Sequence, residues 1–186
     1  MSGVEKKIPE LVAIPSQTVG PFFDFALTTN RSLGAMAGPN VKGERIRLRL
    51  RLLDGEGAPV PDGFFELWQA DAEGQYCSPA FGGFGRLGTD AAGECTFETI
   101  RPGRAYECGS AHISVIVFSR GLLSHLYTRI YFEDDPTLSS DPALAIVPID
   151  RRRTLVAHRL ADGASIATWT HEIRLQGDNE TVFFDL

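Results

Sequence analysis

Tyr76 follows an apolar strand and a tight turn, and its type and position suit metal chemistry. The run 66–70 carries Trp68 and has the composition of a strand end, and Gly74 marks the turn before the tyrosine. A turn of this kind delivers the side chain to a fixed point. A phenolate oxygen placed there can ligate a hard ferric ion. The question that follows is whether further ligands accompany it.

The four histidines do not form a local metal motif. They are His112, His125, His158 and His171, and no two are spaced i, i+2 or i, i+4. Positions 112 and 114 share one face of a strand, so a histidine at 114 would complete a metal-binding pair with His112. Ser114 stands there instead. The pattern therefore favours a hydrogen-bonded structural histidine over a ligand.

Arg129 lies between two tyrosines on one face of an expected strand. In the segment 126–132 the alternation places Tyr127, Arg129 and Tyr131 on the same side. A guanidinium between two rings suits a planar aromatic anion, through charge and stacking together. The pattern by itself favours a plainer interpretation, in which the two rings shield a surface arginine.

Arginines also alternate with apolar residues in the segment 45–52. One face carries Ile46, Leu48, Leu50 and Leu52, and the other carries Arg45, Arg47, Arg49 and Arg51. This alternation is typical of a half-buried strand. Four arginines in a row can bind a polyanion, but a solvated or acid-paired face is the more common structure.

Short strands separated by turns are expected along most of the chain. They are 45–52, 64–70, 95–100, 111–118, 126–132, a hairpin of 153–160 with 165–175, and 181–184. A short helical turn is predicted at 142–147. The glycine-rich run 81–86 opens no helix, which indicates a tight loop and not a phosphate cradle. The pattern predicts an all-β fold, an antiparallel β-sandwich, as a single domain over residues 1–186.

Residues 1–24 are expected to form an extended N-terminal arm. Pro9, Pro15, Gly20 and Pro21 disfavour regular structure there. The arm, together with Phe25 just beyond it, carries more apolar side chains than a solvated tail needs, among them Leu11, Val12, Ile14, Val19, Phe22 and Phe23. Two alternatives stay open, packing across the chain's own domain or against another subunit.

Composition excludes several classes of function. The net charge of −6 argues against general nucleic-acid binding, which requires a basic face. No apolar run approaches the ~18 residues of a membrane span, and no signal peptide is expected at the start. Three cysteines without CxxC spacing predict reduced thiols and a cytoplasmic protein.

Taken together, several segments resemble the intradiol ring-cleavage dioxygenases, and among them the α subunits of the two-subunit enzymes. The resemblance is carried by 15–23, 65–71, 81–86, 126–135 and the ending 177–185, and it covers the chain from about residue 9 onward. It implies a transthyretin-like β-sandwich with extended arms. That fold agrees with the expected strands.

The resemblance also implies a chemistry and a division of labour. Family members bind non-haem Fe³⁺ through two tyrosines and two histidines, which the β subunit supplies in the two-subunit enzymes. With O2 they open protocatechuate between its hydroxyl-bearing carbons, giving 3-carboxy-cis,cis-muconate. Tyr76 matches the first tyrosine, Tyr106 lies near the second, and His112 matches the first histidine. Since Ser114 replaces the second histidine, Tyr76, His112 and Ser114 are expected to be vestigial positions in a chain without its own iron.

The resemblance further implies what this chain contributes to a partner. Thr18, Gly20 and Pro21 are expected to border the active site of the catalytic β subunit, and Arg129 to contact the aromatic substrate. The expected assembly is a large αβ hetero-oligomer.

Two other functions are compatible with the sequence. A self-sufficient dioxygenase would use Tyr76, Tyr106, His112 and one distant histidine, such as His125 or His158. A non-enzymatic transthyretin-like sandwich would only bind or assemble.

Overall fold

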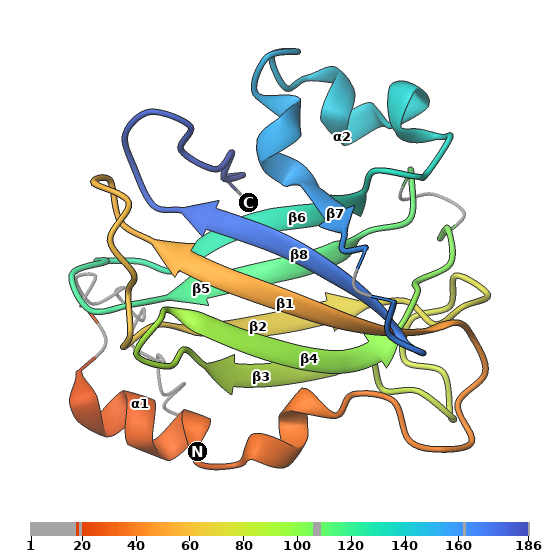
Figure 1. Cartoon of the computed structure of the whole chain (residues 1–186), viewed down its shortest axis with the longest axis horizontal. Coiled ribbons are helices and arrows are strands. Elements are labelled where there is room, and N and C mark those ends of the chain that lie inside the picture. Colours follow the sequence, from red (N-terminus) through yellow and green to blue (C-terminus); the bar gives the residue numbers. More distant parts are fainter. Residues whose placement is uncertain (1–17, 19, 106–108, 162, 186) are drawn as a thin grey trace, which may run out of the picture.

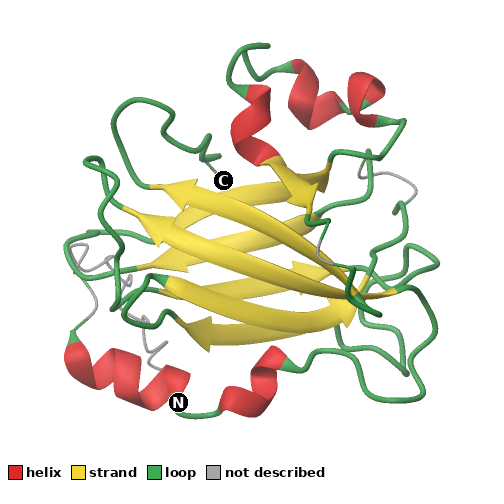
Figure 2. Ribbon diagram, viewed as in Figure 1, coloured by secondary structure: helices red, strands yellow, loops and turns green. Residues whose placement is uncertain are grey.

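Strands make up most of the computed structural model, which describes residues 18, 20–105, 109–161 and 163–185 (Figures 1 and 2). Within these residues the strands are β1 (Arg45–Leu53), β2 (Phe64–Gln69), β3 (Phe84–Gly88), β4 (Glu94–Ile100), β5 (Ile113–Phe118), β6 (Leu126–Phe132), β7 (Val156–Arg159) and β8 (Ala167–Arg174). The helices are α1 (Pro21–Thr28) and α2 (Pro142–Ala145), with 3-10 turns η1 (Arg31–Gly34), η2 (Leu138–Ser140) and η3 (Arg152–Leu155). The all-β class is confirmed.

The strands form one sheet in the order β3-β2-β5-β6-β7-β8-β1-β4. Its two edge strands, β3 and β4, contact each other, so the sheet nearly closes into a barrel. The prediction of a purely antiparallel arrangement is wrong for two pairs, because β1 runs parallel to β8 and β6 runs parallel to β7. Alternation reveals which face of a strand is buried but not which strand lies beside it.

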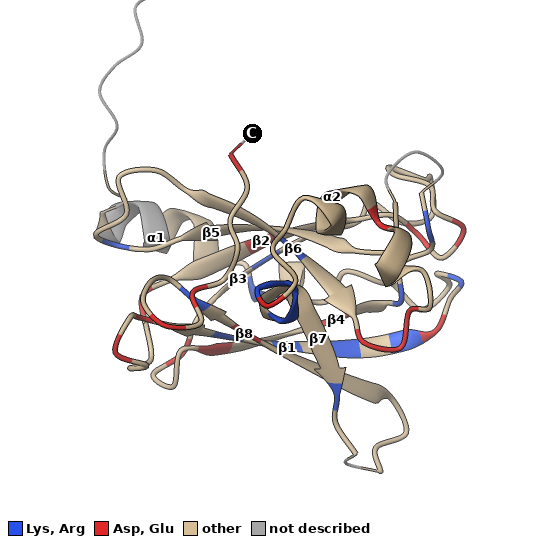
Figure 3. Cartoon of the chain, turned by 90° about the horizontal axis from the view of Figure 1, so that it is seen from above, with Lys and Arg blue, Asp and Glu red and all other residues tan. Residues whose placement is uncertain are grey.

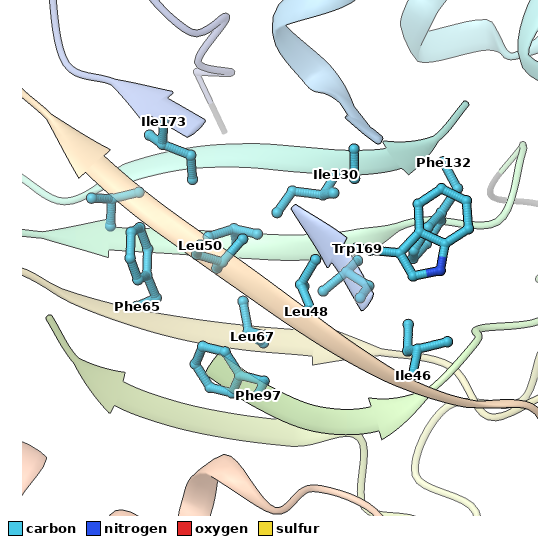
Figure 4. Packing of buried hydrophobic residues seen from close by; sticks show 14 of the residues in the cluster. Ile46, Leu48, Leu50, Phe65, Leu67, Phe97, Ile130, Phe132, Trp169 and Ile173 are labelled. Atoms are coloured by element: carbon cyan, nitrogen blue, oxygen red, sulfur yellow. The ribbon is translucent and has the colours of Figure 1, made fainter. Parts of the chain in front are cut away.

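The core lies between the layer of β1 and β8 and the layer of β2, β5 and β6 (Figure 4). Leu48 and Leu50 on β1 and Leu67 on β2 are fully buried and point into this space. Each such leucine contributes about 2 kcal/mol of burial free energy. The expected acid-paired face of β1 is confirmed for Arg47, whose Nε lies 3.4 Å from Glu98.

Three Asp-x-x-Gly turns of the same construction connect strands. They begin at Asp54, Asp71 and Asp90, and in each the carboxylate accepts the backbone amides of residues two and four positions later. The Asp71 turn precedes Tyr76. Its Gly74 has φ +83°, and a Cβ there would overlap the Arg104 carbonyl, so this turn requires glycine.

The structure corrects several local predictions. Pro21 does not continue the arm but begins α1, because proline's fixed φ suits the first helical position. The second half of the predicted loop 81–86 belongs to β3. The start of the expected strand 153–160 is η3, and 181–184 forms no strand, although Phe184 makes an isolated bridge to Tyr127.

Short helical segments cover the outer sides of the sheet. α1 and η1 lie beside β3, and α2 lies beyond β6 and β7 (Figure 1). Tyr131 on β6 packs there with Leu144, Val147 and Leu155 in a second apolar cluster. None of the helices in the described ranges has the length and apolar character that crossing a bilayer requires.

Candidate functional site

Trp68, Ser114 and Arg129 form a row across β2, β5 and β6. Ser114 pairs directly with Trp68 on one side and with Arg129 on the other. All three alternate with core residues and therefore face away from the core. Since neighbouring strands lie about 4.8 Å apart, the serine hydroxyl and the arginine side chain are cross-strand neighbours.

Tyr76 reaches this row through Trp68. The two rings stack with centroids 6.5 Å apart and planes at 11°. Trp68 is 39% exposed, which is unusual for so large an apolar side chain. The structure thus places the predicted tyrosine beside the row and gives it an aromatic neighbour.

His112 enters β5 as a buried, neutral imidazole. Its Nδ1 lies 2.9 Å from the Ser110 carbonyl, and since a carbonyl only accepts, Nδ1 carries the proton. Burial lowers the pKa of His112, and the nearby Arg129 charge lowers this pKa further. The ring centroid lies 5.7 Å from that of Tyr131.

Asp141 organises this end of the sheet. Its Oδ1 accepts the Leu144 amide at 2.8 Å and the Tyr131 hydroxyl at 3.1 Å, while its Oδ2 accepts the Ser110 amide at 2.7 Å. Burial alone would raise the pKa of Asp141, but these hydrogen bonds outweigh it and hold the pKa below its usual range. The carboxylate therefore fixes α2, Tyr131 and the segment leading to His112 in one arrangement.

Tyr131 lies between Asp141 and Arg129 and interacts with both. Burial raises the pKa of Tyr131 to about 12, and a hydrogen bond with Arg129 opposes the rise. Because the phenol donates its proton to Asp141, its oxygen remains free to accept from the guanidinium. Arg129 also lies 5.9 Å from the Phe184 ring centroid. The guanidinium is thus held on a face with a serine as its strand neighbour.

The described residues around His112 do not fit ferric iron. One imidazole and one serine hydroxyl occupy the positions at which the sequence resemblance led us to expect two histidine ligands, and the Arg129 cation stands beside them. A guanidinium next to a trivalent metal is electrostatically unfavourable. In the described ranges no cluster of three or more His, Cys, Asp or Glu side chains could hold a metal. Tyr106 lies outside the described residues.

The arm residues lie elsewhere on the chain. The Thr18 hydroxyl accepts the Gly121 amide at 2.8 Å, in the turn between β5 and β6. Gly20 is the exposed N-cap of α1 and Pro21 follows it. β5 spans roughly 17 Å, with His112 at its start and this turn beyond its end. The structure therefore brings together His112, Ser114 and Arg129 but places Thr18 at the far end of the strand.

Sequence reasoning missed the groups that position the site. The Asp141–Pro142 pair is a helix N-terminus signal, since an aspartate N-cap commonly precedes proline, and this signal was available. No local pattern marks the contact of Asp141 with Tyr131 and Ser110, because the three lie on separate segments.

Comparison with known proteins identifies the family of this chain. Residues 19–177 match the family model described as Dioxygenase. The chain is 38% identical to the protocatechuate 3,4-dioxygenase alpha chain of Burkholderia cepacia over 92% of this chain and 96% of that one. Its identity to the beta chain of the same organism is 36%, over 76% of this chain and 65% of that one.

Superposition on a solved structure shows that the fold is also that of a dioxygenase. The 3-chlorocatechol 1,2-dioxygenase of Rhodococcus opacus 1CP superimposes with a TM-score of 0.62 at 25% identity, covering 75% of this chain and 63% of that one. Family model, near full-length relatives and fold agree with the motifs of the sequence. The chain therefore belongs to the intradiol ring-cleavage dioxygenase family.

Proposed function

We propose that this chain is the α subunit of a cytoplasmic protocatechuate 3,4-dioxygenase and completes the active site of a catalytic β chain. The β chain holds the Fe³⁺, which supplies coordination of the substrate, and the complex opens the ring with O2. The observation that carries the proposal is the Ser114–Arg129 pair beside His112. A serine hydroxyl stands where a second imidazole would be needed and a cation lies beside it on the next strand, so this face suits an anion and not a metal. The nearly end-to-end match to an alpha chain supports the same assignment.

Arg129 is the residue proposed to recognise the substrate's carboxylate. Arg129 is partly exposed and lies close to Tyr131, which Asp141 holds in place. A preorganised guanidinium can bind a carboxylate through two parallel hydrogen bonds. This chain would therefore select the anionic substrate while the partner performs the oxidation.

We further propose that the chain is one domain whose arm, residues 1–24, borders the partner's active site through Thr18, Gly20 and Pro21. The hydrogen bond from the Gly121 amide to the Thr18 hydroxyl supports this proposal, because it attaches Thr18 of the arm to the β5–β6 turn. The distance between this turn and the His112 end of β5 favours contacts with a neighbour over contacts with the chain's own vestigial site.

Iron content and ring cleavage, measured with and without a co-expressed β chain, test the assignment. The chain alone is expected to lack stoichiometric iron and activity, and both should appear in the complex. A visible phenolate-to-iron absorption band from this chain alone would establish a self-sufficient dioxygenase instead. Failure to form any complex would favour a non-enzymatic assembly protein.

Substrate selection is tested separately in the assembled complex. Arg129→Gln should raise KM for protocatechuate about tenfold while changing kcat less, because the lost contact binds substrate and transition state alike. It should leave KM for catechol, which has no carboxylate, nearly unchanged. Arg47→Gln removes a charge from the opposite layer and serves as the matched control. Equal KM values for Arg129→Gln and the control would remove Arg129 from the substrate site.

A further inference from the structure

Arg49 is the one arginine of the β1 row for which the described residues provide no hydrogen bond or ion pair. Arg45 donates to the carbonyls of Ala37 and Gly38, Arg47 pairs with Glu98, and Arg51 pairs with Glu94 and Glu172. The cross-strand neighbours of Arg49 are Thr96 on β4 and Thr170 on β8, neither of which carries charge. A guanidinium without a carboxylate is free to bind an external anion.

Arg49 lines a pocket of about 450 Å³ where β1, β8, β7 and η3 meet. The pocket also contains Arg153, His158, Thr170, His171 and Glu172. Strand register sets part of this arrangement, because Thr170 pairs with both Arg49 and His158. Three side chains able to donate hydrogen bonds therefore stand in one row along the pocket wall.

Arg153, which also lines the pocket, has no acidic partner among the described residues, and neither do the two arginines that precede it in the chain. η3 begins within the run Arg151, Arg152 and Arg153, and their guanidinium groups donate to backbone carbonyls and to the Asn179 side chain. None of the three pairs with a carboxylate in the described part of the chain. Figure 3 shows the blue bands of basic residues along β1. In a chain of net charge −6, this concentration of unpaired positive charge is local and specific.

The acidic groups near the pocket already have partners. Glu172 lies 3.5 Å from Arg51. Glu133 accepts from His158 Nδ1 at 2.7 Å and from the Arg159 amide at 2.8 Å. Neither carboxylate pairs with Arg49, so the positive charge of Arg49 is left for a ligand.

His171 follows Thr170 on β8, but its side chain lies on the opposite, buried face of that strand. Its Nδ1 donates to the Val156 carbonyl at 3.2 Å, and its Nε2 is buried without a hydrogen-bond partner in the described residues. A buried polar atom without a partner is costly unless a ligand or water satisfies it. Because His171 shares its face with Trp169 and Ile173, this atom takes no part in the anion site.

We propose that this pocket binds a small oxyanion, either a phosphate or a carboxylate, between Arg49, Arg153 and the Thr170 hydroxyl. The pocket is formed by β1, β7 and β8, whereas the row of Trp68, Ser114 and Arg129 lies on β2, β5 and β6. It is therefore a second anion site on this chain and does not depend on the proposed function.

Calorimetric titration of the full chain with inorganic phosphate and, separately, with succinate tests the site. Sodium chloride at matched ionic strength is the reference, because unspecific screening responds to salt alone. Saturable binding of at least one probe is expected, and its identity distinguishes a phosphate site from a carboxylate site. Arg49→Gln should weaken that binding at least about tenfold, as loss of a charge-assisted hydrogen bond predicts.

Arg47→Gln is the matched control. It removes the same charge from the same face of β1, two residues away, but from an arginine that is paired with Glu98. It should change the affinity no more than about twofold. Arg153→Gln provides a second variant in the pocket, and thermal unfolding in chloride verifies that each variant is folded. No saturable binding, or equal losses in Arg47→Gln and Arg49→Gln, would overturn the proposal.

Discussion

Ser114 on β5 pairs directly with Arg129 on β6. A hydroxyl and a cation therefore lie next to His112. The same Arg129 charge contributes to the lowered pKa of His112. The combination of Ser114 with Arg129 thus has two consequences for this face of the sheet. The face is unsuited to a metal cation, and it presents a guanidinium to an anion.

Restoring an imidazole at position 114 should not by itself restore iron binding. In Ser114→His the Arg129 cation still faces any metal, and the repulsion between the two charges is large in a partly buried site. Adding Arg129→Gln should raise iron affinity at least about tenfold over Ser114→His alone. Metal competition assays on the purified chain measure this, with Ser114→Ala/Arg129→Gln as the control without the imidazole. Equal affinities with and without Arg129 would contradict the electrostatic argument.

Asp141→Asn should destabilise the fold by about 2 kcal/mol, because the amide cannot accept at both positions and one buried donor loses its partner. Urea unfolding at neutral pH measures the change. The exposed Asp150→Asn is the control and should stay within about 0.5 kcal/mol of the parent.

The pH dependence of the Asp141 effect has a definite sign. Because the pKa of Asp141 is lowered on folding, its stabilising effect is present above the unfolded pKa of about 3.9 and is lost as pH falls through the folded value. The difference in the free energy of unfolding between the parent and Asp141→Asn should therefore become smaller as the pH falls. A gap that stays constant down to pH ~2 would show that the carboxylate charge contributes nothing.

His171 should make the fold sensitive to mild acid. Burial lowers the pKa of His171 from 6.5 to about 4, so between these values the unfolded chain binds a proton that the folded chain does not. Stability should be flat above pH 6.5 and fall by on the order of 3 kcal/mol as pH decreases to about 4. His171→Leu should flatten most of this slope. The pKa of His112 is also lowered by burial, so a smaller slope of the same sign should remain.

The acid slope is measured by denaturant unfolding at a series of pH values. The exposed His125→Gln should retain the parental slope. If His171→Leu kept the full slope as well, titration of this imidazole would not be its source.

Gly109→Ala should be more damaging than Gly121→Ala, although both glycines have left-handed backbones with φ of +82° and +88°. Each substitution incurs the strain of an L-residue at positive φ, about 1–2 kcal/mol. Only at Gly109 would the new Cβ also overlap Asp141 Oδ2, whereas at Gly121 no atom lies within 4 Å. Thermal unfolding of the two variants measures the stability that each loses, and the difference between them is the cost of the overlap with Asp141. Equal losses of stability would show that Asp141 can move aside.

Local sequence patterns were sufficient to predict features that depend on one strand alone. Alternation at 45–52 and 126–132 located β1 and β6 and identified their buried faces, because period two is set by strand geometry alone. The same patterns could not predict the parallel pairing of β1 with β8, which joins segments far apart in the chain. The glycine-rich run 81–86 predicts a loop over the first residues of β3 because glycine has low strand propensity, and pairing with β2 overrides that propensity.

For the candidate site, the sequence by itself determined the residue types, above all that position 114 carries a hydroxyl and position 129 a guanidinium. Only the tertiary structure decided that these two side chains are neighbours, that Asp141 holds Tyr131 beside the arginine, and that Arg49 lacks the partner its row neighbours have. The reason is physical. A residue's chemistry is local, but its charge balance and hydrogen bonds depend on strands that meet only when the sheet is assembled.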